Sequence, residues 1–492
     1  MFVKGLLGYL PANILQGLIG FASLTVFTRL LPPEAYGHYA LALGVTSLAQ
    51  TLVFTWIEAA MARFYPAEAR EDSEAPLLYG TVYRIFVAVA VVFGLVSAVG
   101  LWLWPVSDAG GAAFKLAIGV SLGSVVSRSL VKLVQEQRKS EGRVGAASMI
   151  DMLQTAGGFG LGVVCAMSGL GGAGPILGGG IIAALTLPLF VREDWGRAVR
   201  GKFDRERARR YFAYGFPVSA SLILTLGLYT IDRFLIAHFL NAGEAGAYHA
   251  GFSLASRILD VLFIWFGAAG APAMVHALES GGEGALKDAA RQQMKLMSFV
   301  LFPAVGGLIM VAPELGGLLI GENLRQEALR VTPLISIGAL LSGFNTYYFL
   351  QAFTLARKTR LLIAAMAVPA VANIVLNLVL IPVMGLIGAA LASALSFGLG
   401  LVTSWWLGRR TLALPVPVTE LSKGGLCVCV MMAILALLPR FGAGLGSDVA
   451  ELSVKAVAGV IIYGCLAWLL NLNDVRNLCG RLFQRLKARA IA

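Results

Sequence analysis

The side chains of this sequence that could do chemistry are a few ionisable groups inside long apolar stretches. One stretch, residues 114–136, contains Arg128 and Lys132, and a second contains Arg257 and Asp260. A charge at the centre of an apolar helix in a bilayer costs ~2.5–3.5 kcal/mol on insertion scales, so structure alone rarely retains several of them. Guanidinium groups bind phosphate in a bidentate geometry, and ammonium groups bind it as point charges. These residues therefore predict the binding of an anion within a membrane.

The first of these stretches has a polar face. Ser121, Ser124, Arg128 and Lys132 follow one another at steps of three and four residues, which places them on one side of a helix. Arg128 lies too deep to reach the interface easily, whereas Lys132 could extend toward the cytoplasmic side. No acid on the same helix stands near Arg128, which makes it a candidate for binding an anion in a cavity. A pairing across to Asp151 of the next span would lower its availability.

The second stretch also has a polar face. His249, Ser253, Ser256 and Asp260 fall at steps of +4, +3 and +4, with Arg257 beside them. The i, i+3 spacing of Arg257 and Asp260 permits an ion pair on one helix. Two interpretations of Arg257 follow: it is a phosphate or gating contact, or it is half of an intramembrane ion pair that fixes the helix.

Four further charged side chains are candidates for coupling, gating or substrate entry. Asp232 and Arg233 lie near the external end of residues 213–237, where an interfacial pair, an outer gate and an ion-coupling site all fit the pattern. Glu58 could carry a coupling proton if it is buried, or it could be the partner of a neighbouring arginine. Arg63 is an interface anchor or a contact for an entering head group. The polar residues expected to line a cavity beside these are Ser121, Ser124, Ser253, Asn345, Tyr348 and Gln351.

We expect the fold that positions these residues to be that of an all-α polytopic membrane protein. The chain has 492 residues, of which 58% are hydrophobic and only 13% are charged, whereas soluble domains carry roughly 25% charged residues. Apolar stretches of ~20 residues, enough to cross a bilayer, recur along the whole length and predict about fourteen transmembrane helices. They are 7–29, 38–60, 85–105, 114–136, 145–167, 173–191, 213–237, 247–271, 296–320, 331–355, 361–381, 386–407, 424–439 and 452–471.

The net charge of +12 is interpreted as a topology signal and not as a sign of nucleic-acid binding. Most Lys and Arg residues fall in alternate loops, and the positive-inside rule makes that side cytoplasmic, with both termini on it. The same basic surface should attract anionic lipid headgroups. The first span follows Lys4 and ends at Arg29 without a small-residue cleavage site, so we expect a retained helix. The five cysteines have neither metal nor redox spacing, and we expect packing thiols and no metal or cofactor.

An internal repeat divides the chain into two six-helix lobes. The turn around Gly37 is echoed around Gly246, and residues 169–173 are echoed at 385–389. Because an even number of helices separates the copies, the two lobes have the same orientation in the membrane. The predicted organisation is an N-terminal lobe (1–191), a basic cytoplasmic linker (192–212), a C-terminal lobe (213–407), two extra helices (408–471) and a basic cytoplasmic tail (472–492).

Several motifs spread over most of the chain match a known family. They are Arg29-Leu-Leu-Pro-Pro-Glu-Ala-Tyr-Gly, the entry Tyr211 to Pro217, Asp232-Arg233 followed by Gly246-Ala-Tyr248, and Asn373-x3-Asn377-x4-Pro382-x2-Gly385-x2-Gly388-Ala389-Ala390. In this order the sequence resembles the polysaccharide (oligosaccharide-lipid) flippase family of the multidrug/oligosaccharidyl-lipid/polysaccharide exporter superfamily. The resemblance implies two lobes around a central cavity that opens alternately to each leaflet. It also implies an undecaprenyl-pyrophosphate-linked oligosaccharide as substrate, for O-antigen, capsule or exopolysaccharide, in a bacterial cytoplasmic (inner) membrane. Glycan polymerase or assembly proteins are the expected partners.

The chemistry of such a substrate agrees with the charged residues. A lipid-linked sugar pyrophosphate has an anionic head and a hydroxyl-rich glycan, so its carrier needs a wet, cationic, hydrogen-bonding cavity. The alternatives are a peptidoglycan-precursor flippase, a multidrug exporter, and a membrane glycan polymerase or glycosyltransferase. Drug exporters should favour acidic and aromatic cavities, and the enzymes should have a substantial extramembrane loop with catalytic residues. The longest loop here is basic and lacks paired carboxylates, so we expect a transporter and not an enzyme.

Overall fold

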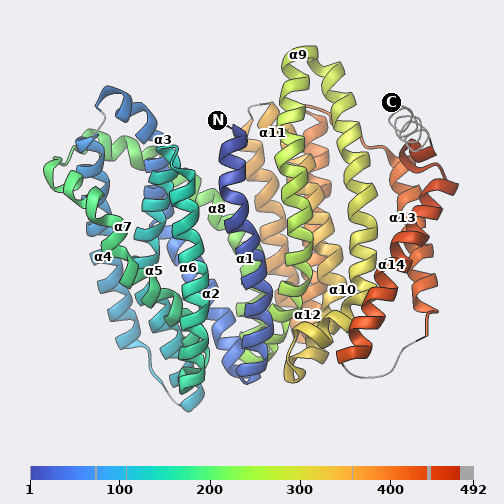
Figure 1. The fold of residues 1–492 in the computed structure, drawn as a ribbon, viewed down its shortest axis with the longest axis horizontal. Helices are drawn as coiled ribbons and strands as arrows, with labels where there is room; N and C mark the ends of the chain where they lie inside the picture. The colour runs from blue at the N-terminus through green and yellow to red at the C-terminus, as the bar shows by residue number, and fades with distance from the viewer. Residues whose placement is uncertain (1, 73–74, 107, 357, 440–444, 477–492) are drawn as a thin grey trace, which may run out of the picture. The chain divides into compact units, whose positions relative to one another are not determined.

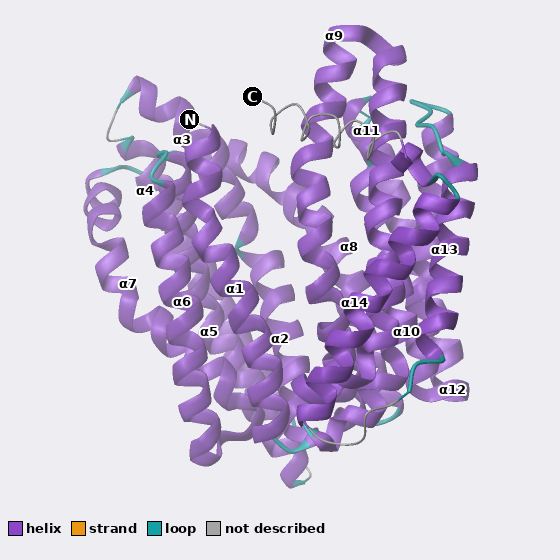
Figure 2. Ribbon diagram, turned by 45° about the vertical axis from the view of Figure 1, so that its right-hand side comes forward, coloured by secondary structure: helices purple, strands orange, loops and turns teal. Residues whose placement is uncertain are grey.

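The computed structural model describes residues 2–72, 75–106, 108–356, 358–439 and 445–476, and every element in those ranges is helical (Figures 1 and 2). The all-helical fold class expected from the composition is confirmed. The first half of the chain forms α1 (Phe2–Leu30), α2 (Pro33–Val53), α3 (Thr55–Glu71), α4 (Pro76–Leu103), α5 (Ala109–Ser140), α6 (Val144–Cys165), α7 (Gly174–Arg200) and α8 (Arg205–Phe239). The second half forms α9 (Ala242–Leu319), α10 (Glu322–Phe344), α11 (Gln351–Leu355), α12 (Thr359–Arg409), α13 (Val418–Ala436) and α14 (Leu445–Leu469). Short π or 3-10 segments are Ala166–Leu170, Gly171–Ala173, Asn345–Phe349 and Leu472–Asp474.

Most of these helices are long and apolar enough to cross a membrane. Among the described residues 10 helices meet that condition, and the number is 11 if α2 and α3, which meet at a 48° bend, form one span. Three of the long helical stretches contain a glycine with positive φ: Gly169 before α7, Gly282 in α9 and Gly385 in α12. Glycine adopts this backbone conformation without a Cβ clash, so the chain can turn back there. Each of these stretches then supplies two spans, and the expected fourteen spans are compatible with the structure.

The surfaces of the helices are apolar where they are exposed. On α4, the side chain of Val96 is 66% exposed and that of Trp102 is 81% exposed. Arg84 is the only charged residue of this helix. A contiguous exposed apolar face is unfavourable in water, and a helix satisfies all its backbone groups internally in lipid. These helices are therefore built to face hydrocarbon.

The ends of the helices follow from local sequence. Pro33 and Pro76 stand in the first turns of α2 and α4, where a missing N–H is not needed. The carboxylate of Asp108 caps α5 by accepting a bond from the Gly111 N–H at 2.7 Å. Asp204 caps α8 in the same way, accepting from Glu206 and Arg207. Short polar residues thus begin the helices that carry most of the candidate residues of the first half.

The chain divides into two compact units, the first ending at Ala250 and the second beginning at Gly251. In the first unit α5 packs against α2, α3 and α7, and α6 packs against α1 and α7. In the second unit α10 packs against α12, and α13 packs against α14. The first unit thus extends beyond the predicted N-terminal lobe to include α8 and the first turns of α9.

Glycines allow α6 and α7 to approach closely. A Cβ at Gly178 would overlap the backbone of Gly162, and a Cβ at Gly158 would lie 3.2 Å from the Cα of Gly179. In lipid no hydrophobic force drives helices together, so small residues that maximise van der Waals contact hold such a pair. This close pair forms one wall of the site described below.

The two turns that the sequence repeats lie in contact with each other. A Cβ on Gly246 would lie 2.9 Å from the backbone N of Gly37, and one on Gly37 would overlap the carbonyl of Ala242. The two turns therefore touch through their equivalent glycines. In the second pair of repeated segments Gly169 and Gly385 both have positive φ, but their ψ angles differ, at 10° and −138°.

The basic segment 192–212 is mostly helical. It continues α7 to Arg200 and begins α8 at Arg205. Gly201 packs against the carbonyl of Pro76, where a Cβ would overlap it. The backbone N–H of Asp204 donates to the hydroxyl of Thr81 at 3.0 Å. The connection between α7 and α8 is thus bonded to α4. The predicted tail lies outside the described residues from position 477 onward.

Candidate functional site

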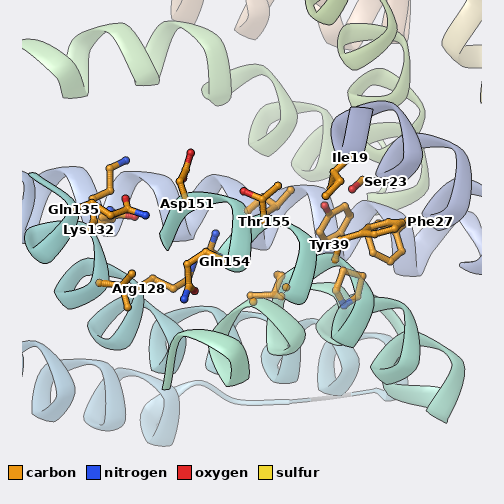
Figure 3. Close-up of a pocket in the computed structure, with 18 residues that line it drawn as sticks. Ile19, Ser23, Phe27, Tyr39, Arg128, Lys132, Gln135, Asp151, Gln154 and Thr155 are labelled. Atoms are coloured by element: carbon orange, nitrogen blue, oxygen red, sulfur yellow. The ribbon is translucent and has the colours of Figure 1, made fainter. Parts of the chain in front are cut away.

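A cavity of about 340 Å³ lies inside the first unit, between α1, α2, α5, α6 and α7 (Figure 3). Its polar lining includes Arg128, Lys132 and Gln135 from α5, and Asp151, Gln154 and Thr155 from α6. Gly158, Pro175 and Gly179 of the close α6–α7 pair form part of its wall. Such a volume is that of a small-molecule site, with a few polar groups that fix the orientation of a ligand.

Helix α5 supplies the cationic side of the cavity because of its period. Arg128, Lys132 and Gln135 recur at steps of four and three residues and lie on one face. Ser124 and Ser121, one and two turns before Arg128, lie outside the lining. The Ser121 hydroxyl donates to the carbonyl of Ala42 at 2.9 Å, and the Ser124 hydroxyl to that of Ser121 at 2.8 Å. The predicted polar stripe is therefore divided into a ligand-facing part and a part buried in helix packing.

Arg128 carries no ion pair among the residues that the structure describes. Its guanidinium carbon would lie 3.8 Å from a Cβ at Gly179, so this glycine leaves room for it over α7. Asp151, the partner considered from the sequence, instead accepts a hydrogen bond from Gln16 of α1. The charge of Arg128 is thus left available to a ligand.

The charges of the lining do not cancel. Arg128 and Lys132 contribute two positive charges and Asp151 contributes one negative charge, so the lining has a net charge of +1. Its uncharged groups are amides and hydroxyls. Gln154 donates to the Thr186 hydroxyl at 2.7 Å, which fixes the amide at the cavity wall. The cationic side chains can bind an anion. The amides and hydroxyls beside them can bind a group rich in hydroxyls.

Two further candidates lie on α3. Glu58 is only 5% exposed, and its Oε1 accepts a hydrogen bond of 3.4 Å from Gln50, a residue of the cavity lining. Arg63 is exposed on α3 and lies outside that lining. The structure thus brings Glu58, and not Arg63, next to the cavity.

Asp232 and Arg233 of α8 are both buried, away from the cavity lining. Asp232 accepts a hydrogen bond from the Tyr248 hydroxyl at 2.9 Å. Tyr248 is itself buried, and its hydroxyl finds this partner inside the protein. Tyr39 lines the cavity.

In the second unit the candidate residues of α9 are not bonded to one another. Arg257 and Asp260 form no ion pair within 4.0 Å in the described part of the chain. Arg257 is half-buried, and its buried Nε finds no hydrogen-bond partner there. Asp260 is exposed, and Ser253 is buried. The i, i+3 pair that the sequence permits is therefore not formed.

The remaining predicted residues of the second unit cluster around the π-helical segment Asn345–Phe349. Asn345 begins this segment, and its buried Oδ1 has no hydrogen-bond partner in the described residues. Tyr348 is fully buried and donates to the carbonyl of Pro415. Gln351 donates to the carbonyl of Thr346 at 3.4 Å. π-Helical turns are frequent at functional sites, and they are not visible in a sequence pattern.

Sequence reasoning missed a buried polar network at the end of α5. Arg138 lies 3.2 Å from Glu141 and 3.5 Å from Asp194, and Gln137 donates to Asp194 at 3.0 Å. Burial alone would raise the pKa of Glu141, but hydrogen bonds from Gln137 and the charge of Arg138 outweigh it and hold that pKa below its ordinary value. The sequence feature that could have indicated this network is the continuation of the polar face of α5 beyond Gln135.

A second network was also missed, in the second unit. The ammonium of Lys455 on α14 contacts the carboxylates of Glu314 on α9 and Glu451 on α14, and all three side chains are buried. The i, i+4 spacing of Glu451 and Lys455 was the available signal. This network joins α14 to the end of α9.

Known proteins share this fold at low sequence identity. The lipid II flippase MurJ, in an inward closed conformation, is similar with a TM-score of 0.75 and 12% identity, over 95% of this chain and 99% of that chain. A multidrug resistance MATE family transporter of the MOP superfamily, in an inward-facing conformation, is similar with a TM-score of 0.64 and 14% identity, over 83% and 96% of the two chains. A MOP superfamily transporter from Pyrococcus furiosus has a TM-score of 0.52 and 14% identity, over 82% and 92%. At these identities the similarity concerns the fold.

Sequence families give a more specific result. No curated protein matches the chain. The family described as polysaccharide biosynthesis protein matches residues 26–328, more than half of the 492 residues, including α5 and every lining residue named for the cavity except Ile19 and Ser23 of α1. Together with the flippase and exporter fold, this match shows that the chain belongs to the polysaccharide biosynthesis protein family.

Proposed function

We propose that this protein is a flippase for undecaprenyl-pyrophosphate-linked oligosaccharide. It moves this lipid from the cytoplasmic to the outer leaflet of the bacterial inner membrane by alternating access, in the biosynthesis of O-antigen, capsule or exopolysaccharide. The family supports a role in polysaccharide biosynthesis, and the fold is that of flippases and exporters. The proposal places both termini in the cytoplasm and takes the glycan-polymerising and assembly proteins as partners.

The observation that carries the proposal is the cationic side of the cavity, where Arg128 and Lys132 form no ion pair with any residue that the structure describes. Arg128 and Lys132 lie together with Gln135, Gln154 and Thr155 around a space of about 340 Å³. A guanidinium without a partner carboxylate can hold the two phosphates of a lipid-linked pyrophosphate, and the amides and hydroxyl can bond the first sugar. A cationic drug would be repelled by the same lining, so a multidrug exporter fits less well. The step needs no bond to be made or broken, and we propose a transporter rather than a glycan polymerase or glycosyltransferase.

A second substrate is favoured by one observation. The similarity to the lipid II flippase covers 95% of this chain with a TM-score of 0.75. A peptidoglycan precursor also carries a polyprenyl pyrophosphate, so the same cavity could accept it. The two substrates have different cellular consequences, which an experiment can separate.

Deletion of the gene tests the proposal in the cell. We expect a lipid-linked oligosaccharide to accumulate on the cytoplasmic leaflet while the surface polysaccharide is lost and peptidoglycan synthesis continues. Accumulation of the peptidoglycan precursor, with arrest of wall synthesis, would assign the second substrate instead. An unchanged surface polysaccharide with no accumulated lipid would refute the flippase function.

Complementation of the deletion strain tests the cavity. Wild-type protein and Lys202→Gln, a change of one exposed cation outside the cavity, should restore the surface polysaccharide. Arg128→Gln, at equal protein level in the membrane, should restore little of it. Equal complementation by Arg128→Gln would show that the cavity of the first unit is not the route of the head group.

A further inference from the structure

The cavity of the first unit has two chemically different ends (Figure 3). Lys132 and Gln135 lie at one end, and the rings of Phe27 and Tyr39 lie at the other. Phe159 completes this aromatic end, because the centre of the Phe27 ring lies 5.5 Å from that of Tyr39 and 5.8 Å from that of Phe159. A ligand that fills the cavity should therefore be polar or charged at one end and apolar at the other.

The periods of α6 and α1 explain these two ends. On α6, Asp151, Thr155 and Phe159 recur at steps of four residues, and on α1 Ser23 stands four residues before Phe27. At 1.5 Å per residue, Asp151 and Phe159 are ~12 Å apart along the helix axis. The two residues with hydroxyls thus stand one helical turn before the aromatic residues, between the polar end and the apolar end.

Arg128 reaches the middle of the cavity over bare backbone. A Cβ at Gly179 would lie 3.8 Å from the guanidinium carbon of Arg128, and a Cβ at Gly158 would lie 3.2 Å from the Cα of Gly179. Gly158 follows Thr155 by three residues and directly precedes Phe159. The two glycines therefore leave a surface without side chains between the cation, the hydroxyl and the aromatic ring, where a sugar ring can approach the backbone closely.

Two hydroxyls beside this surface are left open to a ligand. Ser23 and Thr155 line the cavity, and neither side chain forms a hydrogen bond to any other described residue. By contrast, the hydroxyl of Thr186 on α7 donates to the carbonyl of Ile182 at 2.7 Å. A hydroxyl can both donate and accept a hydrogen bond. The hydroxyls of Ser23 and Thr155 can thus together satisfy the N–H and the carbonyl of one amide group.

We propose that the cavity recognises a 2-acetamido sugar as the first sugar of its lipid-linked substrate. This inference rests on the proposed function. Arg128 holds the phosphate on the anomeric carbon of the sugar. The acetamido group on the adjacent carbon bonds the hydroxyls of Ser23 and Thr155, and its methyl group packs into the aromatic end. A 6-deoxy sugar also offers a methyl group, and a prenyl chain offers several, but neither group would bond the two hydroxyls.

The test compares two ligands that differ in one substituent. Purified full-length protein is titrated calorimetrically with a diphosphate diester that carries a ten-carbon prenyl chain and N-acetylglucosamine, and with its glucosyl analogue. One additional apolar carbon in a fitted pocket gives a discrimination of at least about tenfold. We therefore expect the wild type to bind the diphosphate diester roughly tenfold more tightly than the glucosyl analogue.

Variants assign this preference to the lining residues. Thr155→Val removes the hydroxyl at nearly constant volume and should reduce the preference to roughly twofold, because one neutral hydrogen bond is lost. Thr155→Ser keeps the hydroxyl and should keep the preference. Phe159→Ala should also reduce the preference, because it widens the pocket for the methyl group. Thr25→Val, a matched control on α1 outside the lining, should bind both ligands as the wild type does. Thermal unfolding verifies that each variant is folded.

The outcomes separate this inference from the proposed function. Equal binding of the two ligands by the wild type, or an undiminished preference in either Thr155→Val or Phe159→Ala, overturns the sugar assignment and leaves the flippase function standing. Equal weakening of both ligands by Phe159→Ala assigns the aromatic end to the prenyl chain and also overturns the inference. Failure of the wild type to bind either ligand overturns the proposed function and this inference with it.

Discussion

Replacement of Arg128 gives the sharpest prediction about the site. The guanidinium lines the cavity, pairs with no carboxylate in the described residues, and has room over Gly179. A hydrogen-bonded contact to a charged group contributes ~1.5–3 kcal/mol. Arg128→Gln, which keeps a polar side chain of similar reach, should therefore weaken binding of the diphosphate diester by about 2 kcal/mol, or roughly 30-fold.

A conservative change separates geometry from charge. Arg128→Lys keeps the charge and loses the two-pronged contact, so we expect binding to weaken by about 1 kcal/mol, or roughly fivefold. Lys202→Gln, which removes an exposed cation outside the cavity, should leave binding unchanged. Calorimetric titration of the purified proteins at one ionic strength measures these differences.

Stability distinguishes a binding role from a structural one. An unpaired, desolvated charge destabilises the folded protein, so Arg128→Gln should unfold at the same temperature as the wild type or at a higher one. Unimpaired binding by a folded Arg128→Gln variant would refute the reasoning. A fall in unfolding temperature with normal binding would assign Arg128 to the structure of α5 and α7.

Three further predictions concern stability. Gly178→Ala should destabilise the first unit by ~1–3 kcal/mol, because its Cβ overlaps Gly162, whereas Gly160→Ala, with open space around it, should not; thermal unfolding compares them. The pKa of Glu141 in the folded protein lies below its value in the unfolded chain. The contribution of Glu141 to stability is therefore complete above the unfolded-state pKa and is lost as pH falls through the folded-state pKa. Glu141→Gln should make stability less dependent on pH on the acid side. Lys455→Met leaves the buried carboxylates of Glu314 and Glu451 without their cation and should lower the free energy of unfolding by ~3–5 kcal/mol. Adding Glu314→Gln to this variant should restore part of that loss, and denaturation in detergent measures both variants.

Part of the arrangement at the cavity follows from the helical period of the sequence. Arg128, Lys132 and Gln135 face one cavity because their spacing fixes them to one side of any helix. The same period placed Ser121 and Ser124 on that side, but the neighbouring helix α2 covers this part of α5 and gives Ser121 a backbone partner. Which part of a polar face is covered depends on neighbours that the period does not describe.

Pairing between ionisable groups was the least predictable feature. The i, i+3 spacing of Arg257 and Asp260 allows an ion pair that the structure does not form, and Asp151 bonds to Gln16 rather than to Arg128. A local spacing shows only that two side chains can reach each other. The partner that is chosen depends on which groups other helices bring closer.

The sequence by itself determined the all-helical membrane architecture, the family and the internal repeat. Apolar length, the small number of charges and the glycines of the turns are local properties, and in lipid they leave helices as the only way to satisfy the backbone. Only the tertiary structure decided that Arg128 forms no ion pair within the described part of the chain, that Glu58 is buried next to Gln50, and that Arg138 and Lys455 belong to buried networks. The energy of a charge in low dielectric depends on every group within a few ångströms, and those groups come from helices far apart in the sequence.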